Sequence, residues 1–255
     1  MARQPAVDVV VVADGAQDEG AARAWAARLG LTLAAPDAPS ADALQLRVGA
    51  DGLALRTAGG QEVRAAAHLL GRRRPGQDLL ARAVGPAGEV VDATAGLGAD
   101  AFHLAAGGTR VTMVERVPLV AALLEDALER ARGGALGAEA RAAAARLALT
   151  VGDARAYLAQ RAAAADPPDV VLLDPMYPQR GKAALPGKGM ALFRELVGED
   201  PDVGELLAVA LGAAARRVVV KRPLKAPPLA GVKPSGSLRG TTTRYDLYAP
   251  RRRGP

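Results

Sequence analysis

The chain has 255 residues, a formal net charge of +6, two histidines and no cysteine. These counts exclude disulfides, thiolate catalysis, thiolate zinc sites and a metal centre built mainly from histidines, so we expect no metal. The basic balance favours a polyanionic partner such as nucleic acid, although an arginine-rich composition alone would also produce it.

The first part of the chain has the pattern of a small α+β unit. Apolar residues 7–12 predict a buried strand, and residues 18–29 predict a helix. Residues 44–48 and 53–57 alternate in polarity around a turn sequence, which predicts a hairpin. We therefore place a small N-terminal α+β domain at residues 1–70.

From residue 77 onward, helices and strands alternate. Strands are predicted at residues 90–91, 111–114, 147–151, 170–173, 218–221 and 242–248. Helices are predicted at residues 78–84, 99–106, 118–132, 154–165 and 203–215. This alternation predicts an α/β fold whose mostly parallel sheet is covered on both faces, with the last strand antiparallel at an edge. We place this second domain at residues 71–255.

Four successive strands of the second domain are followed by an acidic residue, either directly or after one glycine: Asp92, Glu115, Asp153 and Asp174. In open α/β sheets, ligands bind beyond the carboxyl ends of the strands. Because burying carboxylates for structure alone is expensive, four acids at these positions predict a binding site.

The loop after the first of these strands is rich in glycine. Its sequence GLGADA (residues 96–101) fits the G-x-G-x-x-G/A fingerprint of dinucleotide-binding proteins, so a nicotinamide-dependent oxidoreductase is one alternative. Two details oppose it. Residues 92–95 separate the strand from Gly96 and Gly98, and Asp100 places negative charge where a pyrophosphate would bind. A ligand with an ammonium group and no phosphate fits this loop better.

S-adenosylmethionine (SAM) is such a ligand. The two glycines would let the backbone approach its methionine part. Glu115 would accept hydrogen bonds from the ribose hydroxyls, Asp153 would accept one from adenine, and Asp92 or Asp100 would face the amino group or bound water. For Asp100 and Asp153 the alternative is helix capping, since both stand where helices begin.

The fourth acid opens the sequence Asp174-Pro175-Met176-Tyr177-Pro178, in which two prolines prevent a regular continuation of the strand. Asp-Pro-x-Tyr resembles the [DNS]-P-P-[YFW] motif of enzymes that methylate exocyclic or amide nitrogens. Asp174 and the Pro175 carbonyl would accept the two N–H bonds of such a nitrogen, and Tyr177 would stack on its base. The alternative is a proline-stiffened turn in which Asp174 is a cap.

Six segments of the chain carry a family resemblance. They are VVDATAGLGADAFHLA, VERVPLVAALLEDAL, LLDPMYPQRGKAAL, LVGEDPD, VVVKRPLKAPPLAG and RYDLYA. Together they resemble the bacterial small-subunit ribosomal RNA methyltransferase J family, in which Asp-Pro-Met-[FY]-Pro is the usual form of the motif. The resemblance covers roughly residues 64–249. It implies a class I SAM-dependent methyltransferase fold and methylation of N2 of guanine 1516 in 16S ribosomal RNA.

The resemblance also implies cofactor contacts at Asp174 and at three pairs of neighbours, Ala99-Asp100, Glu115-Arg116 and Asp153-Ala154. The family often has arginine at position 99, so Ala99 removes any side-chain contact there. Serines are common at positions 153 and 154, where this chain keeps an acceptor for adenine in Asp153. The first 60 residues match the family only loosely.

Basic residues near the predicted pocket favour an RNA path, in which phosphate contacts supply affinity without reading sequence. They are Arg72, Arg73, Arg74, Arg180, Lys182, Lys188, Lys221, Arg222, Lys225 and Lys233. The alternative for any run of charge is a solvated surface.

The expected partner is 16S ribosomal RNA or the small ribosomal subunit. No apolar run reaches the roughly 18 residues of a membrane helix, so we expect a cytoplasmic protein without membrane contact. Two further alternatives stay open: methylation of another nitrogen, such as that of an adenine or a glutamine, and a non-catalytic RNA-binding or assembly factor. The oligomeric state also stays open.

Overall fold

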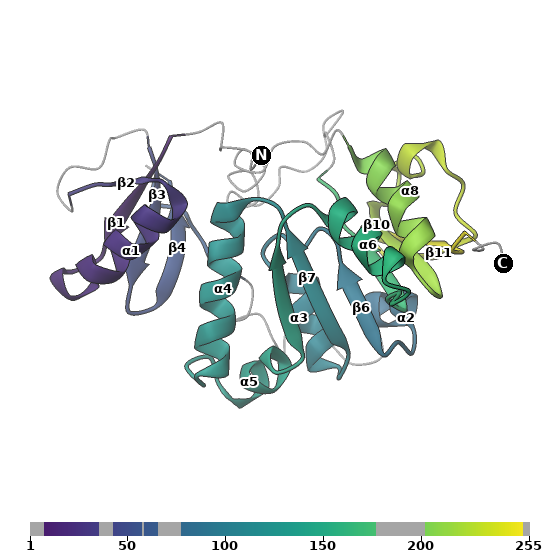
Figure 1. Ribbon diagram of the computed structural model, residues 1–255, viewed down its shortest axis with the longest axis horizontal. Helices are drawn as coiled ribbons and strands as arrows, with labels where there is room; N and C mark the ends of the chain where they lie inside the picture. The colour runs from purple at the N-terminus through teal and green to yellow at the C-terminus, as the bar shows by residue number, and fades with distance from the viewer. Residues whose placement is uncertain (1–7, 36–42, 58, 66–77, 177–201, 252–255) are drawn as a thin grey trace.

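The computed structural model describes residues 8–35, 43–57, 59–65, 78–176 and 202–251, and in them the chain forms two β-sheets (Figure 1). Tyr177 and several residues of the expected RNA path lie outside the described residues: Arg72, Arg73, Arg74, Arg180, Lys182 and Lys188. Among the helices that the structure describes, none combines the length and the apolar character that crossing a bilayer requires.

The first sheet has the strand order β2-β1-β3-β4-β5. Its elements are β1 (Val9–Ala13), η1 (Ala16–Asp18), α1 (Glu19–Leu29), β2 (Thr32–Leu33), β3 (Leu44–Gly49), β4 (Gly52–Arg56) and β5 (Glu62–Val63). The predicted helix is confirmed, and it ends at Gly30, which adopts the left-handed conformation with φ 66°. The predicted hairpin is also confirmed, since β3 pairs antiparallel with β4.

The second sheet has seven strands in the order β11-β12-β10-β9-β6-β7-β8. The strands are β6 (Glu89–Asp92), β7 (Arg110–Glu115), β8 (Leu147–Val151), β9 (Val170–Leu173), β10 (Arg217–Pro223), β11 (Gly236–Arg239) and β12 (Thr243–Tyr248). The helices are α2 (Leu79–Val84), α3 (Ala99–Ala106), α4 (Pro118–Arg132), α5 (Ala138–Ala144), α6 (Ala154–Ala163), α8 (Val203–Ala213) and the short η3 (Leu229–Gly231). Strands β8, β7, β6, β9 and β10 are parallel neighbours, whereas β12 and β11 pair antiparallel.

The order of these strands fixes where a ligand can bind. The chain runs outward from β6 through β7 to β8, and then returns to add β9 and β10 on the other side of β6. The direction of winding therefore reverses between β6 and β9. In open α/β sheets the crevice at such a switch, beyond the carboxyl ends of the strands, is the usual ligand site.

Helix α5 and strand β11 of the second unit escape prediction from the sequence pattern, as do the two-residue strands β2 and β5 of the first sheet. Helix α5 lies in a run of alanines that lacks the contrast between polar and apolar faces, and β11 has one apolar residue in the sequence GSLR. Because β11 pairs on the outer side of β12, the edge of the sheet is β11. The expectation that residues 242–248 form the edge strand is therefore wrong, although their antiparallel pairing is confirmed.

Strand β9 is apolar along its whole length because both faces of the sheet are covered. Val170 and Leu172 pack in the same core cluster as α2, α3, α4 and α5, whereas Val171 and Leu173 pack in a second cluster with α6 and α8. These helices form the outer layers of the sandwich (Figure 1). Alternate residues of β9 therefore face opposite layers of helices.

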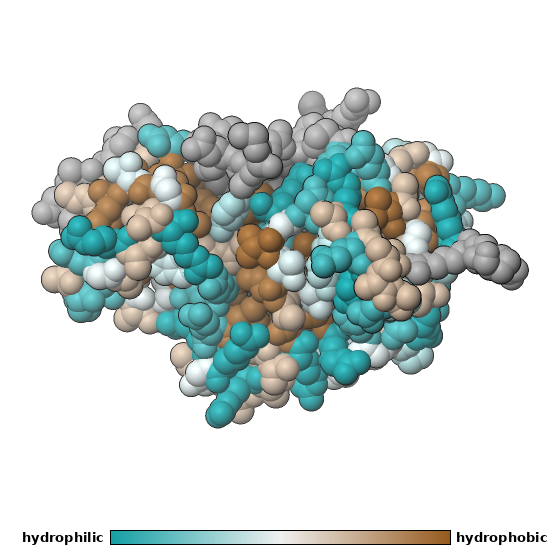
Figure 2. All heavy atoms as spheres, in the orientation of Figure 1, coloured by the Kyte–Doolittle hydropathy of each residue, from teal (hydrophilic) through white to brown (hydrophobic). Residues whose placement is uncertain are grey.

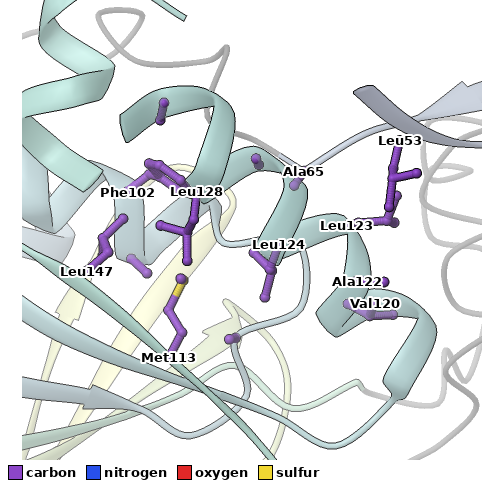
Figure 3. Packing of buried hydrophobic residues seen from close by; sticks show 14 of the residues in the cluster. Leu53, Ala65, Phe102, Met113, Val120, Ala122, Leu123, Leu124, Leu128 and Leu147 are labelled. Atoms are coloured by element: carbon purple, nitrogen blue, oxygen red, sulfur yellow. The ribbon is translucent and has the colours of Figure 1, made fainter. Parts of the chain in front are cut away.

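Helix α4 joins the two sheets through one continuous core (Figure 3). Leu53 of β4 and Leu123 of α4 belong to the same buried cluster as Phe102 of α3 and Met113 of β7. Arg130 of α4 also donates a hydrogen bond of 2.8 Å to the carbonyl of Ala50. The first sheet is therefore packed against the second unit on the face that α4 covers.

A carboxylate on α4 supports this interface, and its removal should be costly. Asp126 Oδ2 accepts a hydrogen bond of 2.9 Å from the backbone N–H of Leu53, and burial raises the pKa of Asp126. Asp126→Ala takes the acceptor from a partly buried N–H group, so we expect the free energy of unfolding to fall by about 1 to 3 kcal/mol. Urea denaturation followed by circular dichroism measures the change.

Glu129→Ala is the matched control, because Glu129 is an exposed acid on the same helix. Its free energy of unfolding should stay within about 0.5 kcal/mol of the wild-type value. If Asp126→Ala is as stable as this control, the hydrogen bond to Leu53 does not help to hold the two sheets together.

Candidate active site

The four predicted carboxylates lie along one edge of the second sheet. Asp92 and Glu115 are the last residues of β6 and β7, Asp153 follows β8 directly after a glycine, and Asp174 follows β9. Because these strands are parallel neighbours, their carboxyl ends meet at the same edge. The strand ends therefore place these acids along one edge of the sheet, where the binding site is predicted.

Three acids and one lysine form a charged cluster at the switch between β6 and β9. Lys221 Nζ, on β10, lies 2.7 Å from Asp100 Oδ2 and 2.8 Å from Asp174 Oδ2. The backbone N–H of Asp174 donates to Thr94 Oγ1 at 2.6 Å, and the backbone N–H of Thr94 donates to Asp92 Oδ1 at 3.3 Å. These contacts tie the ends of three strands and the start of α3 to one another.

Burial dominates the electrostatics of this charged cluster. Asp92 is 3% exposed, and burial together with the charges of Asp100 and Asp174 raises its pKa to about 8, against the hydrogen bond from Thr94 and the charge of Lys221. Burial alone would lower the pKa of Lys221, but the charges of Asp174 and Asp100 outweigh it, so the pKa is raised. At neutral pH, Asp92 is therefore mostly protonated and Lys221 is a cation.

The glycine loop after β6 is fixed by Glu115. This residue is 6% exposed, its Oε2 accepts a hydrogen bond of 2.9 Å from the N–H of Gly96, and its Oε1 accepts one of 2.8 Å from the N–H of Val117. Burial raises the pKa of Glu115 to about 7. Gly98 has φ 80°, and a Cβ there would lie 2.7 Å from Leu124 Cδ2, so both conformation and packing require glycine.

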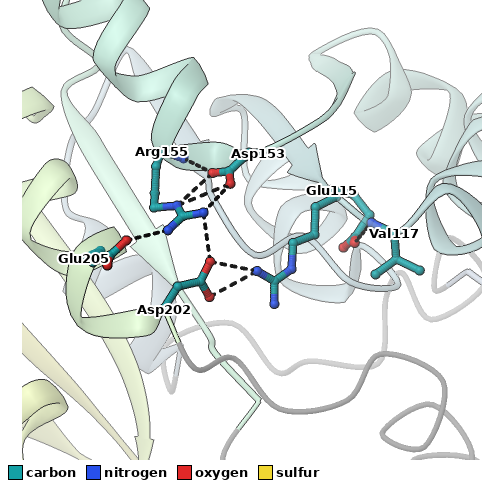
Figure 4. A network of polar contacts seen from close by, with 7 residues as sticks. Glu115, Val117, Asp153, Arg155, Asp202 and Glu205 are labelled. Atoms are coloured by element: carbon teal, nitrogen blue, oxygen red, sulfur yellow. Dashed lines mark hydrogen bonds and ion pairs between the residues drawn. The ribbon is translucent and has the colours of Figure 1, made fainter. Parts of the chain in front are cut away.

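Asp153 and Arg116 belong to a polar network at the ends of β7 and β8 (Figure 4). Asp153 Oδ1 accepts a hydrogen bond of 2.8 Å from the N–H of Arg155, and the Arg155 guanidinium lies 2.6 Å from Asp153 Oδ2. This contact holds the pKa of Asp153 below its usual range. Asp202, directly before α8, pairs with Arg155 at 3.1 Å and with Arg116 at 3.0 Å. The network therefore anchors the start of α8 at the predicted cofactor edge.

The helix-capping alternative is right for Asp153 and wrong for Asp100. Asp153 is the N-cap of α6, and its side chain accepts the capping hydrogen bond. The N-cap of α3 is Gly98, while Asp100 lies in the first turn and pairs with the lysine of the charged cluster. Ala99 and Ala154 are the first residues of α3 and α6, so both stand at this edge of the sheet.

The structure corrects two members of the expected RNA path at the end of β10. Arg222 is 1% exposed and donates a hydrogen bond to the carbonyl of Pro227, so it is a buried arginine and does not contact phosphate. Lys221 is committed to two carboxylates of the charged cluster instead of solvent. Alternation along β10 sends these two neighbouring side chains to opposite faces of the sheet, so both cannot face one RNA path.

Two other residues of the expected RNA path, Lys225 and Lys233, are among the described residues. They lie at opposite ends of the strands of the sheet. Exposed Lys225 follows the end of β10, on the same edge as Asp174. Lys233 precedes β11, whose first residues pair with the last residues of β12, so Lys233 lies toward the opposite edge, away from Asp174, and its assignment to the RNA path gains no support. Exposed Arg239 ends β11 opposite Arg244 and therefore lies on the site edge, although sequence reasoning did not select it.

An exposed apolar residue stands two positions before Asp153. Val151, the last residue of β8, is 53% exposed, which is unusual for a large apolar residue in this chain. Figure 2 shows one face of the molecule, on which apolar residues gather over the strands between α4 and α6. An apolar surface next to a hydrogen-bond acceptor suits a flat heterocyclic ring with an amino group.

The site as a whole suits a cationic, hydroxyl-bearing ligand. The cation of Lys221 lies between Asp100 and Asp174, which shows that this place stabilises an ammonium group. Asp100 in the first turn of α3 opposes the binding of a pyrophosphate there. In the described part of the chain, no group of three or more His, Asp or Glu side chains has a geometry that holds a metal ion.

Comparisons with known proteins agree with this description. Residues 33–250 match a family model described as "Putative SAM-dependent methyltransferase". Two relatives are each called ribosomal RNA small subunit methyltransferase J: one from Pseudomonas paraeruginosa, 48% identical over 89% of both chains, and one from Pseudomonas fluorescens, 45% identical over 97% of both. The crystal structure of a SAM-dependent methyltransferase from Neisseria gonorrhoeae is 36% identical, with a TM-score of 0.73 over 95% of this chain and 96% of that one.

The expected class I fold and the resemblance found in the six segments are both confirmed by these matches. The matched regions extend over most of the chain. They include much of the first sheet, which lies in the part of the sequence that resembles the family only loosely. The chain belongs to the ribosomal RNA small subunit methyltransferase J family of SAM-dependent methyltransferases.

Proposed function

We propose that the protein transfers a methyl group from SAM to the exocyclic N2 of a guanine in 16S ribosomal RNA, at guanine 1516 by family resemblance. The observation that carries the proposal is the position of Asp174. Its carboxylate is 43% exposed, follows the strand at the topological switch, and is held by Lys221 on one side and through its backbone by Thr94 on the other. Family membership supports RNA as the substrate class.

The residues of the site fit SAM. The backbone of the Gly96–Gly98 loop would lie against the methionine part, and the carboxylates of Glu115 and Asp153 would receive the ribose hydroxyls and the adenine amine. Glu115 accepts two backbone hydrogen bonds here, and each of its oxygens has a second lone pair for a ligand. When bound, SAM supplies an electrophilic methyl group on a sulfonium centre.

The target nitrogen is a poor nucleophile, because its lone pair is delocalised into the guanine ring. Asp174 and the carbonyl of buried Pro175 would accept its two N–H bonds and turn the lone pair toward the methyl group. The nitrogen then forms a C–N bond as the C–S bond breaks, and releases one proton to water. Tyr177 would stack on the base after it leaves its neighbours. Catalysis in this scheme comes from positioning.

We also propose two domains, a small α+β domain at residues 1–70 and the methyltransferase domain at residues 71–255. Their support is that the strands up to Val63 form one sheet and those from Glu89 onward form another. The boundary itself lies outside the described residues. Because the proposed partner is the small ribosomal subunit or its RNA, we place the protein in the cytoplasm, with Lys225 and Arg239 beside the RNA.

The test is transfer of a labelled methyl group from SAM to naked 16S RNA and to small ribosomal subunits that lack the modification. Mass spectrometry identifies the labelled nucleoside, and we expect N2-methylguanosine at one site. Label on adenosine, or on a glutamine side chain in the subunit proteins, would replace guanine as the target. No label despite measurable SAM binding would overturn the RNA substrate, and nicotinamide binding that S-adenosylhomocysteine does not displace would support an oxidoreductase instead.

A further inference from the structure

Lys221 occupies a place that an ordinary surface lysine would not. Its side chain is 26% exposed, and its ammonium group bridges Asp100 on α3 and Asp174 after β9 at 2.7 and 2.8 Å. Taking an ammonium group out of water is expensive unless it is paired and hydrogen-bonded. Since both partners belong to the proposed cofactor and substrate site, the pairing acts on that site.

The acids of the charged cluster would disturb one another without this cation. The charged groups near Asp174 are Asp100 on α3 and Lys221 on β10, and Asp92 on β6 adds a carboxyl group that ionises as the pH rises. Carboxylates in one partly buried site repel each other, and one of them responds by taking up a proton or by turning away. A protonated or rotated Asp174 would no longer present the acceptor that the target nitrogen requires.

We propose that Lys221 is a positioning residue for methyl transfer, which holds the Asp174 carboxylate ionised and in a fixed direction for the N–H of the target base. The inference rests on the proposed function. Two contacts fix Asp174 independently: Thr94 Oγ1 accepts from its backbone N–H, and Lys221 pairs with its Oδ2. The backbone and the side chain of Asp174 are thus fixed in their orientation before the substrate binds, as catalysis by orientation requires.

The first test compares Lys221→Gln, which keeps hydrogen-bond donors and removes the charge, with Lys221→Arg, which keeps the charge. Labelled-methyl kinetics should show kcat reduced about 10- to 100-fold in Lys221→Gln, with the KM for RNA nearly unchanged. The acid limb of its pH–rate profile should move up by about one pH unit, because Asp174 has lost its cation. Lys221→Arg should restore the wild-type position of that limb and part of the rate.

Lys233→Gln is the matched control, because Lys233 is an exposed lysine toward the opposite edge of the sheet. It should leave kcat and the pH profile at the wild-type values. A Lys221→Gln enzyme with the kcat and acid limb of this control would overturn the proposal. A lowered kcat with an unmoved acid limb, not rescued by arginine, would also overturn it, since a purely structural lysine gives that result.

A second measurement separates this inference from the proposed function. Carbon-13 labelling of aspartate carboxyl groups, with the Asp174 signal assigned from Asp174→Asn, follows the titration of Asp174 without any substrate. We expect the midpoint at higher pH in Lys221→Gln and at the wild-type value in Lys221→Arg. If wild type methylates no RNA but the midpoint moves, the proposed function fails and the coupling of Lys221 to Asp174 stands. An unmoved midpoint in Lys221→Gln, or a moved one in Lys221→Arg, overturns the coupling.

Discussion

Asp174→Ala should lower kcat for methyl transfer by about 10²-fold, the order of the cost when a reacting group loses its orientation. The variant loses the carboxylate that orients the target nitrogen, and it leaves Lys221 with one of its two carboxylate partners. Asp174→Asn should fall between wild type and Asp174→Ala, because its amide oxygen keeps one acceptor. Single-turnover transfer of labelled methyl to small ribosomal subunits measures the rates.

Asp166→Ala is the matched control for this series. Asp166 is an exposed acid shortly before β9, and its ion pair with Arg161 is at the surface, where such pairs contribute little. Calorimetric titration with SAM on each variant separates cofactor affinity from chemistry. An Asp174→Ala enzyme within about threefold of the control would mean that the Asp-Pro-Met-Tyr sequence is a stiff turn without a role in orientation.

Asp92→Asn should raise the melting temperature by about 5 to 20 °C at pH 8 and by little at pH 5. Burial and the neighbouring acids raise the pKa of Asp92 from the ordinary 3.8 to about 8. Between these values the folded protein holds a proton that the unfolded chain has released. Asp92 therefore lowers stability progressively as the pH rises through this window, by about 3 to 6 kcal/mol at its upper end. The asparagine has no charge to bury.

Thermal unfolding by calorimetry at pH 5 and pH 8 tests the sign of this effect. Asp51→Asn serves as the control, because Asp51 is exposed in the turn between β3 and β4. It should show the same melting temperature as wild type at both pH values. An Asp92→Asn shift that is equal at pH 5 and pH 8 would contradict the titration and point to a change in packing.

Local signals in the sequence predicted several elements almost residue by residue. Helix α4 begins at Pro118 and ends before Gly133, as predicted, because proline suits a first helical turn and glycine a helix end. Helix α5 and strand β11 lack such signals. Their conformation depends on neighbours that lie far away in the chain: α5 packs on α3 and α4, and β11 exists because β12 offers it an edge.

The position of a site residue could be predicted where it depends only on the end of one strand. Asp92, Glu115, Asp153 and Asp174 each follow a strand, so the parallel sheet brings them to one edge. Lys221 was assigned to RNA, because the pairing of a side chain depends on the angle at which α3 approaches β10, and the linear pattern does not contain that angle. The ion pairs that Asp202 forms with Arg116 and Arg155 were not predicted, for the same reason.

The packing of β4 against α4 constrains the order in which the protein can mature during translation. Leu53 and the residue that receives its N–H, Asp126, are 73 positions apart in the chain. The first sheet therefore leaves the ribosome well before the helix that covers its apolar side. Its strands can pair early, but their buried face has no cover until α4 emerges. We expect slowed elongation between these points to lengthen exposure of that face and to increase its capture by nascent-chain chaperones.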